Sequence, residues 1–170
     1  ATSGPVSRDD DTIDVLTLGG SVLLQVESVL ESRLREELGD RVRCYHLSTT
    51  AHTSRDSLQK YQQLAGRKFD LVILCHGIND VRMNYWPTSL FKNDYTHCPW
   101  YADLARDVQL GRLTLWDRVL QFATQEGLGP PARSDFPLGD SLKTPPAFES
   151  HLSELASEAA ARDDRVLFLT

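Results

Sequence analysis

The sequence predicts a doubly wound α/β sandwich, in which helices cover both faces of a parallel sheet. Short apolar runs without polar alternation recur along the chain, as is typical of strands buried on both faces. Segments with helical periodicity separate these runs, and such alternation of strands and helices builds parallel sheets. The chain has 170 residues, 41% of them hydrophobic, which is enough for one domain with its own core.

Four apolar runs predict the strands of this sheet. They are residues 13–18 (IDVLTL), 42–47 (VRCYHL), 69–75 (FDLVILC) and 165–169 (RVLFL). The second run is the weakest of the four. Residues 1–12 are polar and acidic, so we expect a disordered lead-in there and a domain over residues 13–170.

The segment after the first strand predicts an amphipathic helix. Its apolar residues recur at spacings of three and four: Leu23, Val26, Leu30, Leu34 and Leu38. Glu27, Glu31 and Arg35 are expected on another face, with Glu31 and Arg35 as an i,i+4 ion pair. Gly39 is expected to end the helix.

Three further helices are predicted after the second strand. One spans residues 54–65, and another spans residues 101–125. The last follows Thr144 as its N-cap, with Pro145 at its first position. Glycines and prolines recur along residues 127–146. This composition predicts a long loop of the kind that often serves as a lid.

The bulk properties exclude several classes of function. The net charge is −6 and no block of basic residues occurs, so nucleic acid and anionic membranes are not expected partners. No apolar stretch reaches the roughly 18 residues of a membrane-spanning helix. Cys44, Cys75 and Cys98 fit no zinc-binding spacing, so neither a metal nor a cofactor is expected.

The candidate site lies at the carboxyl ends of the strands, where parallel sheets bind ligands. Gly20 and Ser21 follow the first strand, in a turn with three interpretations: a helix cap, a phosphate-binding loop, or an exposed nucleophile. The glycine spacing of phosphate-binding loops is absent. After the third strand, Gly77 permits a sharp exit, Asp80 is expected to cap a helix, and Asn79 is either a turn residue or an oxyanion donor.

These strand ends together resemble a known family. "TLGGS" and "HGIND" resemble blocks I and III of the SGNH hydrolases, also called the GDSL esterase/lipase family, and "YHLSTTAHTSRDSL" at residues 45–58 resembles block II. The resemblance extends from about residue 13 to residue 170. It implies a three-layer α/β/α sandwich with a parallel, flavodoxin-like sheet.

The resemblance implies roles for individual residues. Ser21 corresponds to the nucleophile and Asn79 to an oxyanion donor. Ala51, or in another register Ser48, corresponds to a glycine whose backbone N–H completes the oxyanion hole. Gly20 stands where the family has an aspartate outside the catalytic triad.

The family's base is a histidine in a D-x-x-H block after a fifth strand, and no such block occurs through Thr170. We therefore expect the last strand, the C-terminal helix and the catalytic His/Asp pair beyond Thr170 or on a second polypeptide. A sheet that ended at its fourth strand would expose an apolar edge.

The remaining candidates would shape the substrate site. His76 and His52 are expected to line the pocket rather than act as base, and the other histidines, His46, His97 and His151, are expected to be solvated or packed. Arg82 could bind a carboxylate or phosphate. Aromatic residues then form either a loop packed on its own rings or a substrate wall: Trp86, Tyr95, Trp100 and Tyr101.

The leading hypothesis is a serine hydrolase that removes an O-acyl group from a carbohydrate or lipid. The alternative is a glycan- or acyl-binding module without catalysis, which the missing base and the departures at Gly20 and Ala51 favour. A third reading is a flavodoxin-like nucleotide or phosphate binder. The polar N-terminus would suit the stalk of an exported enzyme.

Overall fold

A computed structural model describes residues 11–85, 91–96 and 142–169. The chain forms two compact units, Ala1–Asn79 with Phe148–Thr170, and Asp80–Ala147. Of the predicted lead-in, only residues 11 and 12 are among the described residues. The predicted helix at 101–125 and the predicted loop as far as residue 141 lie outside them. None of the described helices combines the length and apolarity needed to cross a membrane.

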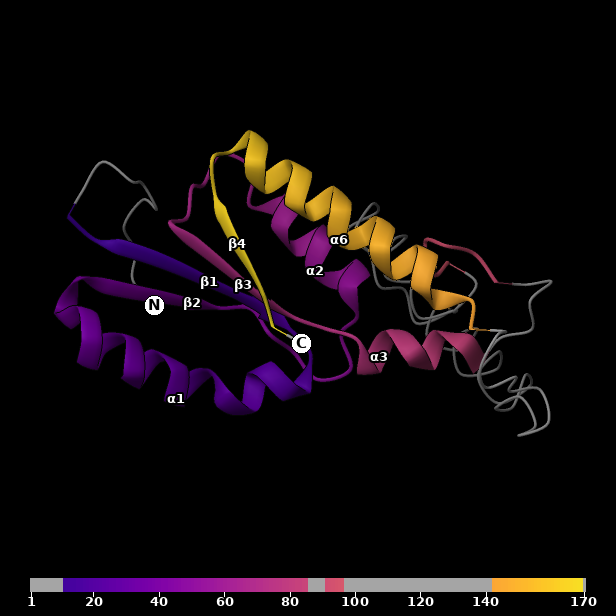
Figure 1. Ribbon diagram of the computed structural model, residues 1–170, viewed down its shortest axis with the longest axis horizontal. Helices are drawn as coiled ribbons and strands as arrows, with labels where there is room; N and C mark the ends of the chain where they lie inside the picture. Colours follow the sequence, from indigo (N-terminus) through magenta and orange to yellow (C-terminus); the bar gives the residue numbers. More distant parts are fainter. Residues whose placement is uncertain (1–10, 86–90, 97–141, 170) are drawn as a thin grey trace, which may run out of the picture. The chain divides into compact units, whose positions relative to one another are not determined.

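The first unit contains a parallel four-stranded sheet, which confirms the predicted α/β class. The strands are β1 (Ile13–Gly19), β2 (Val42–His46), β3 (Leu71–Cys75) and β4 (Arg165–Leu169). Their order in the sheet is β2-β1-β3-β4, and every neighbouring pair is parallel. Helix α1 covers one face of the sheet, and α2 and α6 cover the other (Figure 1).

The helices begin and end close to the predicted residues. Their bounds are α1 (Ser21–Leu38), α2 (Ser54–Gln63), α3 (Ile78–Val81) and α6 (Thr144–Ala161), with 3-10 turns η1 (Gly39–Arg41) and η2 (Arg82–Tyr85). Gly39 ends α1 with φ of 75°, as expected. Helix α6 begins at Thr144 itself and not after it, and the Asn84 side-chain oxygen accepts the Lys143 and Thr144 N–H groups.

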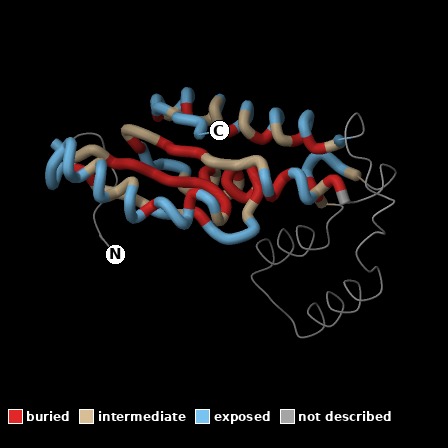
Figure 2. The backbone as a smooth tube through the Cα atoms, turned by 60° about the horizontal axis from the view of Figure 1, so that its bottom comes forward, coloured by how far each residue is buried: buried red, intermediate tan, exposed pale blue. Residues whose placement is uncertain are grey.

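Two apolar clusters hold the sheet between its helices. Alternate residues of a strand point to opposite faces, so Leu16 packs with α2 and α6 whereas Val15 packs on the α1 side. The first cluster is the larger: Leu16, Leu18, Leu58, Tyr61, Phe69, Val72, Leu74, Leu155 and Ala159. Figure 2 shows the buried central strands beside the exposed outer side of α1.

The buried face of α1 differs in part from the prediction. Leu23 is buried and Leu30 and Leu34 pack against the sheet as expected, but Val26 is 47% exposed. Glu27 is instead buried, because its carboxylate accepts the hydroxyl hydrogen of Thr17 on β1. A buried polar partner on the sheet has therefore turned a charged residue inward.

Strand β4 lies at an edge of the described sheet and carries exposed apolar side chains. The exposed fractions are 45% for Leu167, 42% for Phe168 and 37% for Leu169. The apolar edge expected from the sequence is therefore present in the described part of the chain.

Candidate active site

The turn after β1 places Ser21 at the carboxyl edge of the sheet. Gly20 is the N-cap of α1 and Ser21 is its first residue. The Gly20 N–H donates to the Cys75 carbonyl over 3.4 Å, which ties the end of β1 to the end of β3. Ser21 is half-buried, and within the described residues its hydroxyl has no hydrogen-bond partner. A helix N-terminus at this position favours negative charge beside the hydroxyl.

Gly20 is glycine for lack of space. A Cβ at this position would lie 2.6 Å from Asn79 Nδ2 and 3.2 Å from the His52 carbonyl oxygen. Its φ of −89° is accessible to any residue, so the close approach rather than the backbone angle excludes a side chain. The aspartate found here in the SGNH family would therefore clash with Asn79 as this chain holds it.

Asn79 is fixed beside this turn. Its side chain is buried, and its Nδ2 donates to the His52 carbonyl over 2.8 Å. Within the described residues that carbonyl is the only acceptor recorded for the Asn79 amide, which carries two hydrogens. The carboxyl ends of β1 and β3 and the loop after β2 therefore meet at Gly20, His52 and Asn79.

Ala51 occupies a conformation that glycine favours. Its φ is 66°, in the left-handed region. The His52 N–H donates to the Thr49 carbonyl over 3.3 Å, so Ala51 is the third residue of a tight turn, where a positive φ is typical of type II turns. The Thr49 N–H donates to the Gly19 carbonyl over 3.0 Å and ties this turn to β1.

A small pocket opens beside the turn. Its volume is about 150 Å³, and its lining residues are Gly20, Val22, Cys75, His76, Gly77, Ile78 and Asn79. Two of the predicted substrate-binding residues, Gly20 and His76, are thus part of the pocket, whereas Ser21 and Ala51 are not among the described lining residues. Arg82 is exposed and belongs to the other unit, and Trp86 lies outside the described residues.

Two neutral histidines lie behind this site. His76 Nε2 is 2.6 Å from Ser57 Oγ on α2, and its Nδ1 is buried without a hydrogen-bond partner among the described residues. Burial lowers the pKa of His76 to about 4, against the opposing charge of Asp56. Burial also lowers the pKa of His52. Both rings are therefore uncharged at neutral pH.

The other described histidines face different partners. His151 is buried, with Nδ1 3.0 Å from Ser54 Oγ, so it is packed as expected. His46 contacts Thr17 and Glu31 on the α1 side of the sheet. None of the described histidines hydrogen-bonds Ser21, and His97 lies outside the described residues.

One expectation for the segment after β3 is wrong. Asp80 does not cap a helix, since it lies inside α3 and its carboxylate accepts the Tyr95 hydroxyl hydrogen over 3.0 Å. Tyr95 is fully buried and packs edge-on against Phe91, which agrees with a loop packed on its own rings and not with a substrate wall at this residue. The other three aromatic residues of this segment lie outside the described residues.

Sequence reasoning missed the polar groups on α2 behind the site. The Asp56 carboxylate accepts the Thr53 N–H over 2.7 Å, and Ser57 meets His76. The sequence could have predicted the Thr53–Asp56 contact, because these two residues have the spacing of a capping box. Nothing in the sequence pattern indicated that Ser57 would face β3.

Comparison with known proteins leaves the family open. No protein-family model and no curated protein matches the chain. The crystal structure of TesA aligns with 90% of this chain and 76% of its own, at 18% identity and a TM-score of 0.36. The psychrotrophic esterase EstA from Pseudoalteromonas sp., inhibited by monoethylphosphonate, aligns with 92% of this chain and 76% of its own, at 14% identity and a TM-score of 0.38. Similarity this weak carries no argument about activity.

Proposed function

We propose that the protein is a serine ester hydrolase of the SGNH type. The observation that carries the proposal is the position of Asn79, whose buried amide lies against Gly20 at the turn that presents Ser21. In this mechanism Ser21 Oγ attacks the ester carbonyl, and a tetrahedral intermediate with a negatively charged oxygen forms. The second amide hydrogen of Asn79 and the N–H groups of Ser21 and Ala51 would stabilise that oxygen.

The pocket favours a short acyl group. A volume of about 150 Å³ is well below the roughly 300–1,000 Å³ of pockets for drug-sized ligands. An acetyl group would fit, with the alcohol portion of the ester outside the pocket. The substrate class we propose is therefore an O-acetylated or similarly short-chain ester of a carbohydrate or lipid.

The mechanism requires a base that takes the Ser21 proton. None of the described histidines hydrogen-bonds Ser21, and His46, His76 and His151 contact other groups. The base therefore has to come from outside the described residues. If no base is supplied, the second candidate function is a module that binds the same ester without hydrolysing it.

A fluorophosphonate probe tests the nucleophile. The wild-type chain should be labelled at Ser21, and Ser21→Ala should abolish labelling. Ser28→Ala, which removes an exposed serine on the same helix, should leave labelling intact. An unlabelled wild-type chain would favour the binding module, and labelling that persists in Ser21→Ala would reject the assigned nucleophile.

Hydrolysis of p-nitrophenyl acetate tests the oxyanion hole. Asn79→Ala should lower kcat by about 10²–10³ with a smaller change in KM, because the lost donor acts mainly in the transition state. Circular dichroism should verify that this variant is folded. An unchanged kcat would remove Asn79 from the mechanism.

A further inference from the structure

We propose a zinc site formed by Glu31, Cys44 and His46, on the α1 side of the sheet and independent of the ester hydrolase proposal. One donor atom from each residue lies within 4.8 Å of the other two. A carboxylate, a thiolate and an imidazole are the three ligand types that Zn²⁺ takes in proteins. The sequence showed no zinc spacing because the ligands come from two different elements.

The backbone explains how the three donors meet. Cys44 and His46 are two residues apart on β2, so both side chains point to the same face of the sheet. Cys44 packs in the apolar cluster on the α1 side, which identifies that face. On α1, Glu27 and Glu31 are one turn apart, and both carboxylates lie near the His46 ring on β2.

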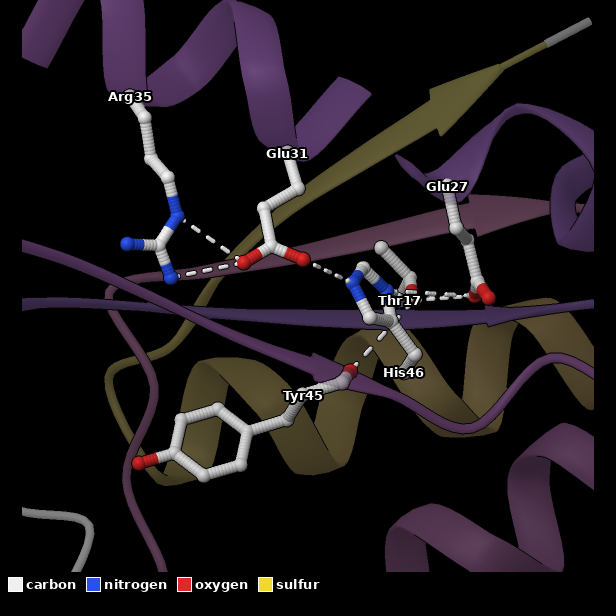
Figure 3. Close-up of polar contacts among 6 residues, drawn as sticks. All are labelled: Thr17, Glu27, Glu31, Arg35, Tyr45 and His46. Atoms are coloured by element: carbon white, nitrogen blue, oxygen red, sulfur yellow. Dashed lines mark hydrogen bonds and ion pairs between the residues drawn. The ribbon is translucent and has the colours of Figure 1, made fainter. Parts of the chain in front are cut away.

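His46 presents its two ring nitrogens to different groups. Its Nδ1 lies 3.0 Å from the Thr17 hydroxyl oxygen, and that hydroxyl donates its hydrogen to Glu27 Oε1. Its Nε2 faces Glu31 on α1 (Figure 3). A contact at Nδ1 orients the ring so that Nε2 can bind a ligand.

Nε2 of His46 also lies close to a carboxylate oxygen. Its distance to Glu31 Oε2 is 2.9 Å. With the Cys44 thiol as the third donor, one nitrogen, one oxygen and one sulfur ligand lie together on the α1 side of the sheet.

Arg35 prepares Glu31 for single-oxygen coordination. Its Nε and Nη2 both donate to Glu31 Oε1, over 3.0 and 2.8 Å, and leave Oε2 toward His46. Figure 3 shows Glu31 between Arg35 and His46. With a Zn²⁺ ion bound, the charges of the Glu31 carboxylate and the Cys44 thiolate neutralise the metal.

The thiol of Cys44 selects the kind of metal. A metal that binds sulfur has to displace the thiol proton into solvent. Zn²⁺ and the other late first-row transition metal ions bind thiolate strongly enough to displace the proton, whereas Mg²⁺ and Ca²⁺ prefer oxygen ligands. The His46 and Glu31 side chains are 28% and 29% exposed, so the ion has access from solvent.

Cobalt binding to the full chain tests the site. Co²⁺ added under a non-thiol reductant should give a sulfur-to-cobalt charge-transfer band that Zn²⁺ displaces. Cys44→Ser should lose the band, whereas Cys75→Ser, which removes a thiol on β3, should keep it. Glu27→Gln should keep the band but weaken binding about 10–100-fold, because it disturbs only the support of His46.

Three outcomes would overturn the zinc site. They are no charge-transfer band in the wild-type chain with Co²⁺ in excess, a band that persists in Cys44→Ser, and Zn²⁺ binding that is unchanged in Glu31→Gln. Glu31→Gln keeps the thiol and the shape of the helix, so it remains informative if Cys44→Ser does not fold. Circular dichroism distinguishes a folded variant without the metal from an unfolded one.

Discussion

Gly20 is the residue at which the local turn and the candidate site depend on each other. The sequence identified a glycine–serine turn but left its purpose open. In the folded chain, a Cβ at Gly20 would clash with the Asn79 amide, so the turn needs glycine because of a residue 59 positions later in the sequence. The turn thereby places Ser21 and Asn79 at one edge of the sheet, as the strand ends predicted, whereas their paired roles came only from the family resemblance.

Ala51 offers a test of backbone strain at the proposed oxyanion hole. Its left-handed φ costs a residue with a Cβ about 1–2 kcal/mol, while glycine loses about 0.5–1 kcal/mol of stability through chain entropy. We expect Ala51→Gly to leave the free energy of unfolding unchanged or to raise it by up to about 1 kcal/mol in urea denaturation. Ala156→Gly, inside α6, should instead lower it by about 1 kcal/mol. Equal losses in both variants would contradict strain at Ala51.

His76 should make stability fall in mild acid. Its pKa drops from 6.5 to about 4 on folding. Between pH 6.5 and pH 4, His76 is therefore protonated in the unfolded chain but not in the folded chain. The contribution of neutral His76 to the free energy of unfolding is complete above about pH 6.5 and is lost as the pH decreases toward 4. The slope of this loss is at most about 1.4 kcal/mol per pH unit. Because His76 is only half-buried, the measured slope should be smaller.

His76→Gln should flatten this part of the pH profile in urea denaturation, since glutamine can still contact Ser57 but does not titrate. A residual slope is expected because burial also lowers the pKa of His52. An unchanged profile would mean that His76 takes up its proton equally in the folded and unfolded chain.

Asp164 joins several elements of the sheet unit at the turn between α6 and β4. Its carboxylate accepts the hydroxyl hydrogen of Tyr61 on α2 over 2.6 Å and the N–H of Phe69 before β3 over 3.0 Å. Tyr61 is fully buried, and Arg162 lies over its ring at 4.2 Å. The order of helices and strands follows from sequence pattern, whereas this connection depends on a carboxylate about 100 residues from its partners.

Asp164→Asn should destabilise the fold by about 1.5–3 kcal/mol. The amide would keep one acceptor oxygen but would point donor hydrogens at one of two buried donors. Asp163→Asn is the matched control, because Asp163 is exposed with φ of 62°, which asparagine tolerates. Chemical denaturation should give the control a change within about 0.5 kcal/mol. A similar loss in both variants would mean that the buried carboxylate has no special contribution.

At the scale of the whole molecule, we expect the apolar edge of the described sheet to promote self-association. An apolar edge strand offers unpaired backbone groups to other chains. Leu167→Lys should therefore reduce self-association, as measured by size-exclusion chromatography with light scattering. The net charge of −6 moves toward zero in this variant, which by itself would not improve solubility.

Val29→Lys is the matched control for the edge prediction. Val29 is 61% exposed on α1, away from the sheet edge, and the substitution changes the charge equally. It should leave self-association unchanged. If both variants reduced association equally, the edge would have no particular role.

The sequence by itself determined the parallel sheet, because continuous apolar runs separated by amphipathic segments leave few other ways to bury both faces of the strands. It also determined which residues follow the strands, and therefore where a site could form. Only the tertiary structure decided which side chains meet there. Val26 is exposed, whereas Glu27 and Tyr95 are buried because each meets a polar partner, Thr17 or Asp80, that local periodicity does not encode. The Glu31, Cys44 and His46 cluster arises in the same way, from a helix face and a strand face that only the packing of α1 on β2 brings together.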